Sequence, residues 1–129
     1  MTPEFVHDEV EALAGTHGTL RWQVWASATS DDLMTMLQVF DGDVPVASSG
    51  FGGPALYAGH RVNEWRGRID DLPYFVVARA AVDVSRLVAV TDRGTHVGLA
   101  LGAVDARFGL RFAAAGRAII RTCGWSSAG

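Results

Sequence analysis

Apolar and polar residues alternate along most of this chain, in short runs that turn residues separate. The clearest run is Leu20–Ala28, where Trp22, Val24 and Ala26 occupy every second position. Side chains of a β-strand point alternately to opposite faces, so this period of two predicts a strand with one buried face. Further runs typical of strands cover residues 33–40, 44–48, 61–68, 74–81, 87–91, 95–101, 107–114 and 118–123.

The segments between these runs have the composition of turns. Asp92, Arg93 and Gly94 separate two of the runs and form a three-residue hairpin loop, with glycine where φ must be positive. Pro45 lies within the run 44–48 and has no N–H to donate to a neighbouring strand. We therefore expect that strand at the edge of a sheet.

The first residues differ from the rest and predict an α-helix over about residues 3–14. Val6, Val10 and Leu13 are spaced i, i+4 and i+7, which places them on one face of a helix. Pro3 suits the first helical position, and Gly15 suits the position after the last one.

These patterns together predict an all-β fold with one N-terminal α-helix. About eight or nine short strands at regular spacing are typical of an antiparallel β-sandwich or a flattened barrel, and the sequence leaves both open. A chain of 129 residues is long enough for one core, so we expect a single domain over residues 1–129. Its strands should run from about residue 19 to 123, and residues 124–129 should form a frayed tail.

Composition excludes several classes of protein. A 49% share of hydrophobic residues argues against disorder, and a net charge of -3 argues against a nucleic-acid partner. No apolar run is long enough to span a membrane, and no signal-peptide pattern begins the chain. The single cysteine, Cys123, cannot form an internal disulfide, which predicts a cytoplasmic protein.

All 11 basic residues are arginines, and the chain contains no lysine. The absence of lysine excludes a P-loop and Schiff-base chemistry. The alternation places many of the arginines outward, where they suit planar acidic or aromatic partners. These are Arg61, Arg66, Arg68, Arg79, Arg93, Arg107 and Arg111.

One strand carries the residues that favour a binding or proton-transfer site. His60, Glu64 and Arg66 lie at positions of equal parity, so an extended strand would project all three from one face. The alternative is that they form the solvated side of an antiparallel sheet. Two ligands on one strand are too few for a zinc or iron site, so we predict no metal site, no cofactor and no catalytic residue.

The stretch from residue 49 to 60 precedes this strand and contains four glycines and one proline. A pocket under this loop would be lined by Phe51 and Tyr57 together with His60, Glu64 and Arg66. The alternative is a flexible connection between two strands, which explains the glycines equally well.

Two tryptophans fall outside the expected core. Trp25 interrupts the polar face of its strand, and Trp125 lies near the end of the chain. Exposed tryptophans are enriched at binding surfaces, so both are predicted to contribute to an interface with a second copy or another partner. The alternative for Trp25 is that the N-terminal helix covers it.

The segment Asp83-Val-Ser-Arg-Leu-Val-Ala-Val-Thr-Asp-Arg-Gly-Thr-His-Val-Gly-Leu, followed by Phe108-Gly-Leu-Arg-Phe-Ala, resembles a family of small domains. Similar segments occur in β-sandwich domains of uncharacterised proteins from high-GC actinobacteria. The resemblance covers the last third of the chain and implies a strand–hairpin–strand core, with no functional residue attached.

The leading functional interpretation is a non-enzymatic interaction or ligand-binding β-sandwich that self-associates through an aromatic surface. The alternative is a small enzyme or small-molecule carrier with its pocket under the 49–60 loop. These two interpretations differ in whether His60, Glu64 and Arg66 meet in a cavity or lie on a flat sheet face.

Overall fold

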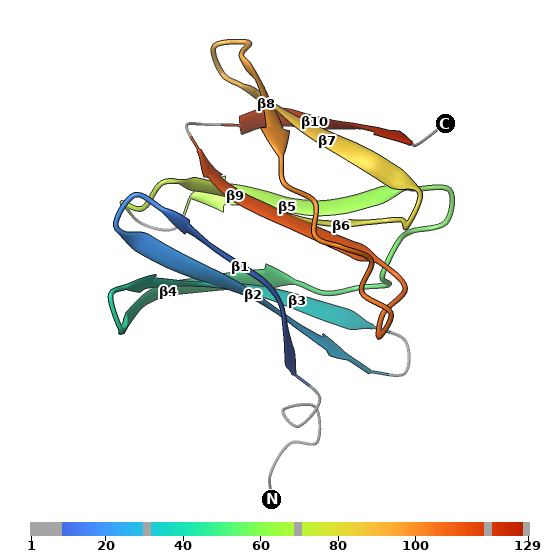
Figure 1. Ribbon diagram of the computed structural model, residues 1–129, viewed down its shortest axis with the longest axis horizontal. Helices are drawn as coiled ribbons and strands as arrows, with labels where there is room; N and C mark the ends of the chain where they lie inside the picture. The colour runs from blue at the N-terminus through green and yellow to red at the C-terminus, as the bar shows by residue number, and fades with distance from the viewer. Residues whose placement is uncertain (1–8, 30–31, 69–70, 118–119, 128–129) are drawn as a thin grey trace, which may run out of the picture. The chain divides into compact units, whose positions relative to one another are not determined.

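The computed structural model describes residues 9–29, 32–68, 71–117 and 120–127 (Figure 1). These residues form ten antiparallel strands in three sheets. The chain divides into two compact units, Met1–Ala55 and Leu56–Gly129.

The first unit contains one four-stranded sheet in the order β1-β2-β3-β4. Its strands are β1 (Val10–His17), β2 (Leu20–Ala28), β3 (Leu33–Asp41) and β4 (Val44–Phe51). The predicted strand Leu20–Ala28 is confirmed, since β2 begins and ends at these residues. The edge prediction is also confirmed, because β4, which contains Pro45, is an outer strand of the sheet.

The predicted N-terminal helix is wrong. From Val10 onward the chain forms strand β1, which pairs with β2. The described residues contain no helix. Residues 3–8 of the predicted helix lie outside the described residues. The register shifts between Glu11 and Leu13, so Ala12 is an extra residue in the ladder. A bulge of this kind breaks the period of two, and Val10 and Leu13 then have the spacing of a helix.

Gly15 does not end a helix but lies within β1, opposite Trp22. The indole of Trp22 covers it so closely that a Cβ on Gly15 would lie 2.3 Å from the Trp22 Cζ2 atom. Trp22 is 6% exposed and belongs to the buried face of the sheet, together with Val24, Leu37 and Val39. The apolar positions predicted for β2 therefore do form a buried face.

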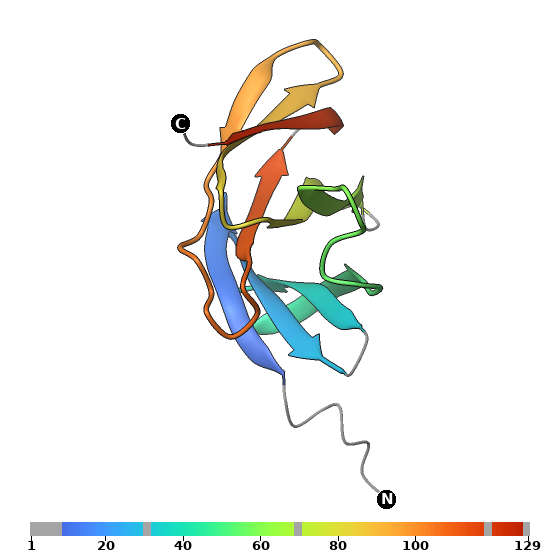
Figure 2. The same ribbon diagram turned by 90° about the vertical axis from the view of Figure 1, so that its right-hand side faces the viewer.

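The second unit contains two three-stranded sheets, with strand orders β5-β6-β9 and β10-β7-β8. The strands of the first are β5 (Val62–Arg68), β6 (Tyr74–Ala80) and β9 (Arg111–Arg117). Those of the second are β7 (Val84–Thr91), β8 (His96–Leu99) and β10 (Ile120–Ser127). The hairpin of β7 and β8, yellow to orange in Figure 2, turns at Gly94 with a φ of 79°, as predicted.

Both sheets of the second unit contribute to one apolar core, in which small and branched side chains predominate. Val76 and Ala78 of β6 are buried in it together with Leu87 and Ala89 of β7. The guanidinium of Arg111 in β9 donates hydrogen bonds to the carbonyl oxygen of Gly102, in the segment after β8, at 2.8 Å and to that of Val84, the first residue of β7, at 2.9 Å. These bonds connect β9 to the beginning of β7 and satisfy two backbone acceptors.

Strand β6 is buried on both faces, since every residue from Phe75 to Ala80 is buried. This includes Arg79, which is 0% exposed, so its predicted outward orientation is wrong. Such burial is typical of a central strand in a sheet that is covered on both sides, where a period of two no longer separates inside from outside.

Two boundaries near the C-terminus also differ from prediction. Residues 107–110 were expected in a strand, but residues 107–109 form a turn, Leu110 forms only an isolated bridge with Asp105, and β9 begins at Arg111. The Asp105 carbonyl accepts a hydrogen bond from the Gly109 N–H, and its carboxylate accepts one from the Arg107 N–H at 3.0 Å. Residues 124–127, expected in a frayed tail, continue β10 and pair with β7.

The all-β class is therefore correct, although the helix is absent from the described residues and ten strands replace the eight or nine expected. A single domain over the whole chain stays a prediction. In the part of the chain that the structure describes, no helix is long and apolar enough to cross a membrane.

Replacing Gly15 by Ala should destabilise the protein by about 1–3 kcal/mol, because the added methyl group must displace the packed Trp22 ring. The matched control is Gly98→Ala in β8, where a Cβ meets nothing within 4 Å. Denaturant unfolding should show the control within about 0.5 kcal/mol of the wild type. Equal stability of the two variants would contradict the close contact between Gly15 and Trp22.

The Asp105 turn should make stability depend on acid pH. Hydrogen bonds from the Arg107 side chain, then from its backbone, and its positive charge lower the pKa of Asp105 below its ordinary value of 3.8. The lowered pKa stabilises the fold at neutral pH, and this contribution is lost as the pH falls below 3.8. Asp105→Asn should therefore lower the urea midpoint at neutral pH and match the wild type in acid, whereas Asp92→Asn should follow the wild type throughout.

Candidate functional site

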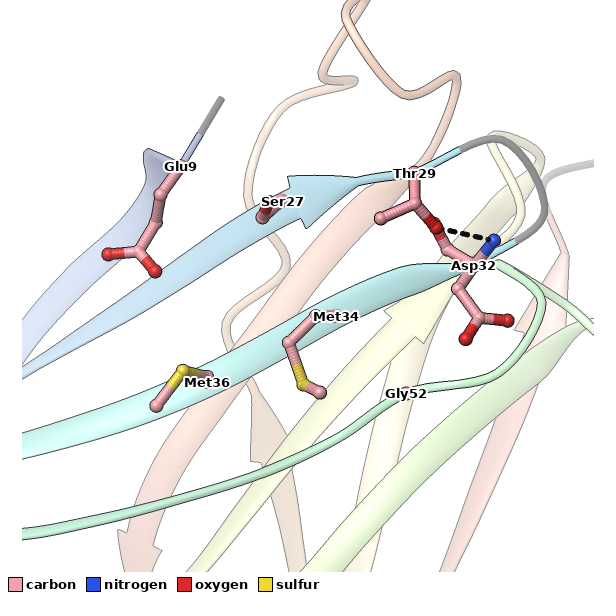
Figure 3. Close-up of a pocket in the computed structure, with 7 residues that line it drawn as sticks. All are labelled: Glu9, Ser27, Thr29, Asp32, Met34, Met36 and Gly52. Atoms are coloured by element: carbon pink, nitrogen blue, oxygen red, sulfur yellow. Dashed lines mark hydrogen bonds between the residues drawn. The ribbon is translucent and has the colours of Figure 1, made fainter. Parts of the chain in front are cut away.

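A groove of about 290 Å³ opens on the first unit, at the end of the sheet where β2 passes to β3. Figure 3 shows its lining residues, which come from the two strands β2 and β3 and from segments next to the four strands of the sheet. They are Glu9, Ser27, Thr29, Asp32, Met34, Met36 and Gly52. The lining thus combines two thioethers, two hydroxyls and two carboxylates.

The alternation of β3 places both methionines in this groove. Leu33, Thr35 and Leu37 are buried, and the side chains between them, Met34 and Met36, project from the opposite face. We call this face the groove face. Met34, the second residue of β3, is 45% exposed.

Two glycines of the neighbouring strand leave space for these side chains. Gly50 pairs with Met36, and a Cβ on Gly50 would lie 3.1 Å from the Met36 Cγ atom. Gly52 follows β4, and a Cβ there would lie 3.7 Å from the Met34 Cε atom. The Leu33 N–H donates a hydrogen bond to the Gly53 carbonyl at 2.8 Å, which holds this glycine segment beside β3.

Hydrogen bonds between Thr29 and Asp32 hold one end of the groove in place. The Thr29 N–H donates to the Asp32 carbonyl at 2.8 Å, and the Asp32 N–H donates to the Thr29 Oγ1 at 3.2 Å. Both bonds use backbone groups of Asp32, and its exposed carboxylate belongs to the groove lining. Glu9 lies at the other end, just before β1 (Figure 3).

The groove is chemically suited to binding. Thioethers are apolar, polarisable and flexible, so methionine surfaces adapt to ligands of different shapes. The carboxylates at the two ends accept hydrogen bonds and attract positive charge. Among the described residues, no group of three or more His, Cys, Asp or Glu side chains is arranged to hold a metal ion.

The residues predicted to line a pocket under the 49–60 loop fall in both compact units. Phe51 is the last residue of β4 in the first unit and pairs with Thr35. Tyr57 and His60 belong to the second unit, where their ring centroids are 6.1 Å apart in an edge-to-face arrangement. The His60 N–H donates to the Tyr57 carbonyl at 2.9 Å, so His60 lies in a turn rather than in the predicted strand.

Glu64 and Arg66 do lie on one face of β5, as the alternation predicts. Their side chains form an ion pair, with 3.3 Å between the Arg66 Nε and Glu64 Oε1 atoms. The other carboxylate oxygen, Glu64 Oε2, is buried and has no hydrogen-bond partner within the described structure. The two side chains are 24% and 31% exposed, respectively, so they are neither a fully solvated face nor a closed site.

Of the two predicted interface residues, the structure describes the side chain of Trp25 but not that of Trp125. Trp25 lies on the groove face, opposite Met36 on one side and Glu11 on the other, and is half-buried. The strand β1, not a helix, adjoins its strand, so the alternative of a covering helix is wrong for the described residues. The side chain of Trp125 lies outside the described residues, although its backbone pairs with Leu87.

Sequence reasoning missed the groove residues altogether. The available signal was the Met34-Thr35-Met36 pattern, which puts two methionines on one face of a strand. Nothing in the sequence indicated that Gly50 and Gly52 would stand beside them. The carboxylates of Glu9 and Asp32 were assigned to a helix and to a turn, respectively.

Comparisons of the chain with protein-family models, with curated protein sequences and with solved structures give no significant match. The resemblance to actinobacterial β-sandwich domains therefore stays a prediction. The function has to be inferred from the geometry of the groove and its surroundings.

Hydrogen peroxide should oxidise Met34 faster than Met36 in the native protein, because Met34 is 45% exposed and Met36 only partly so. Peptide mapping by mass spectrometry measures the gain of one oxygen atom at each residue. In denaturant the two rates should become equal, which controls for intrinsic reactivity. Equal rates in the native protein would contradict the described exposure of the groove.

Proposed function

We propose that this protein is a non-catalytic binding module and that the groove of its first unit is a ligand site. The observation that carries the proposal is the exposed Met34 next to the half-buried Met36, beside the side-chain-free Gly52. Exposed methionines in a concave site provide adaptable apolar contact area.

The polar part of the lining also favours binding over catalysis. Its residues include two hydroxyls and two carboxylates but no histidine, cysteine, lysine or arginine. A serine or threonine nucleophile needs an adjacent base, usually a histidine or a lysine, and the lining has neither. The thioethers that occupy the middle of the groove transfer no protons.

A carrier site in the second unit is the second candidate. It rests on the buried Glu64 Oε2 atom, which has no hydrogen-bond partner within the described structure, next to the ion pair with Arg66. A buried acceptor of this kind gains stability when a ligand donates a hydrogen bond to it. This candidate retains His60 and Tyr57 from the sequence prediction and omits Phe51, which belongs to the first unit.

Two further parts of the proposal rest on the sequence. Self-association through Trp25 and Trp125 stays a prediction, supported by the partial exposure of Trp25 on the groove face. The cytoplasmic location is inferred from the single cysteine.

A thermal-shift screen with a broad library of small molecules tests the groove as a ligand site. A ligand at ten times its Kd should stabilise the wild type by about 1.4 kcal/mol. Gly52→Leu should abolish this shift, because the added side chain enters the groove from a residue whose φ is outside the left-handed region.

The matched control for this experiment is Gly98→Leu, which adds the same side chain in β8, where the space is open. Hits should bind this control as tightly as they bind the wild type. Hits that bind Gly52→Leu unchanged would locate their site elsewhere and count against the groove. Loss of such a hit in Glu64→Gln would favour the carrier site.

A further inference from the structure

We propose that the ligand of the groove is a small organic cation, with a primary ammonium group on an apolar body. This inference rests on the proposed function, that the groove is a ligand site. It adds the charge, the size and the chemical class of the occupant.

The residues in the middle of the groove favour a ligand with an apolar body. Met34 and Met36 lie next to one another on the groove face, and Gly50 and Gly52 present no side chain beside them. An alkyl chain or an aromatic ring placed there removes the exposed Met34 side chain from water. Burial of apolar surface is the main favourable contribution to such a contact.

The carboxylates at the two ends of the groove favour a ligand with a positive charge. The ionisable side chains in its lining are both carboxylates, Glu9 at one end and Asp32 at the other (Figure 3). An ammonium group has three N–H donors and pairs with a carboxylate through charge-assisted hydrogen bonds. An anionic ligand would meet like charge at either end, so the site selects against it.

The size follows from the volume. The groove encloses about 290 Å³, roughly twice the ~150 Å³ of a protein cavity that binds benzene. An octyl chain or a phenylalkyl group therefore fits, and a large cofactor does not.

A small molecule is a better occupant than a second copy of this protein. The sequence contains no lysine, so a second copy would have to place an arginine in the groove. The short stem of an arginine covers less of the methionine pair than an octyl chain does. A lysine side chain from another protein has the required charge, but its stem is shorter than an octyl chain and covers less of the methionine pair. We therefore assign the groove to a free amine.

Calorimetric titration of the full chain at low ionic strength tests this assignment with n-octylammonium, 1-octanol and octanoate. These probes share one apolar chain and differ in charge. Octylammonium should bind about threefold more tightly than octanol, because its single ammonium group pairs with one exposed carboxylate at a time. Octanoate should bind more weakly than octanol, and added salt should reduce both differences. Capped lysine amide should bind more weakly than octylammonium.

Single charge-removing variants identify the groups responsible. Of Glu9→Gln and Asp32→Asn, the variant that removes the carboxylate paired with the ammonium group should weaken octylammonium binding about threefold, and the other should weaken it less. Both variants should leave octanol binding unchanged. The matched control is Asp43→Asn, which removes the same charge from an exposed position outside the groove lining. Its affinity for octylammonium should equal that of the wild type.

Three outcomes would overturn the inference, and each differs from a failure of the proposed function. Equal binding of octylammonium and octanol, lost in Gly52→Leu, would refute the charge preference while the groove remained a ligand site. A capped lysine amide that binds as tightly as octylammonium would assign the groove to a protein partner. No binding of any probe would refute this ligand class, and the library screen would still test the groove with other classes.

Discussion

The uninterrupted pairing of β2 with β3 is the constraint on which the first unit depends. Nine residue pairs, from Leu20 opposite Asp41 to Ala28 opposite Leu33, follow one another without a register shift. A slip by one residue would exchange the two faces of the strand. It would expose Leu37 and bury Met36, so the same ladder that forms the buried face also forms the groove.

Every basic residue of this chain other than histidine is an arginine. In the second unit, arginines occupy buried as well as exposed positions. Arg111 donates to two backbone carbonyls, and Arg107 donates to the Asp105 carboxylate through both its side chain and its backbone. Arg79 is completely buried in a central strand. The planar guanidinium has five donors in a fixed geometry, which suits such structural positions better than a compact ammonium group. In the second unit, arginines therefore have structural roles within the fold.

The errors of the sequence prediction occur where local geometry departs from a regular period. The extra residue Ala12 gave β1 the spacing of a helix, and the Asp105 turn shortened β9 at its N-terminal end. Both features depend on hydrogen bonds between residues that pattern analysis treats independently. The predicted pocket under the 49–60 loop stays a prediction, because Phe51 and Tyr57 are close in sequence but belong to different compact units.

The sequence by itself determined the all-β class, most of the strands, the edge position of Pro45 and the turn at Gly94, because alternation and turn chemistry are local properties. Only the tertiary structure decided which residues form the groove. Met34 and Met36 are remote in sequence from Glu9 and Gly52. The sheet places β4, which leads to Gly52, on one side of β3, and places β1, which follows Glu9, on its other side beyond β2. Strand pairing between distant segments decides such neighbours, and a single strand's pattern does not encode its partner.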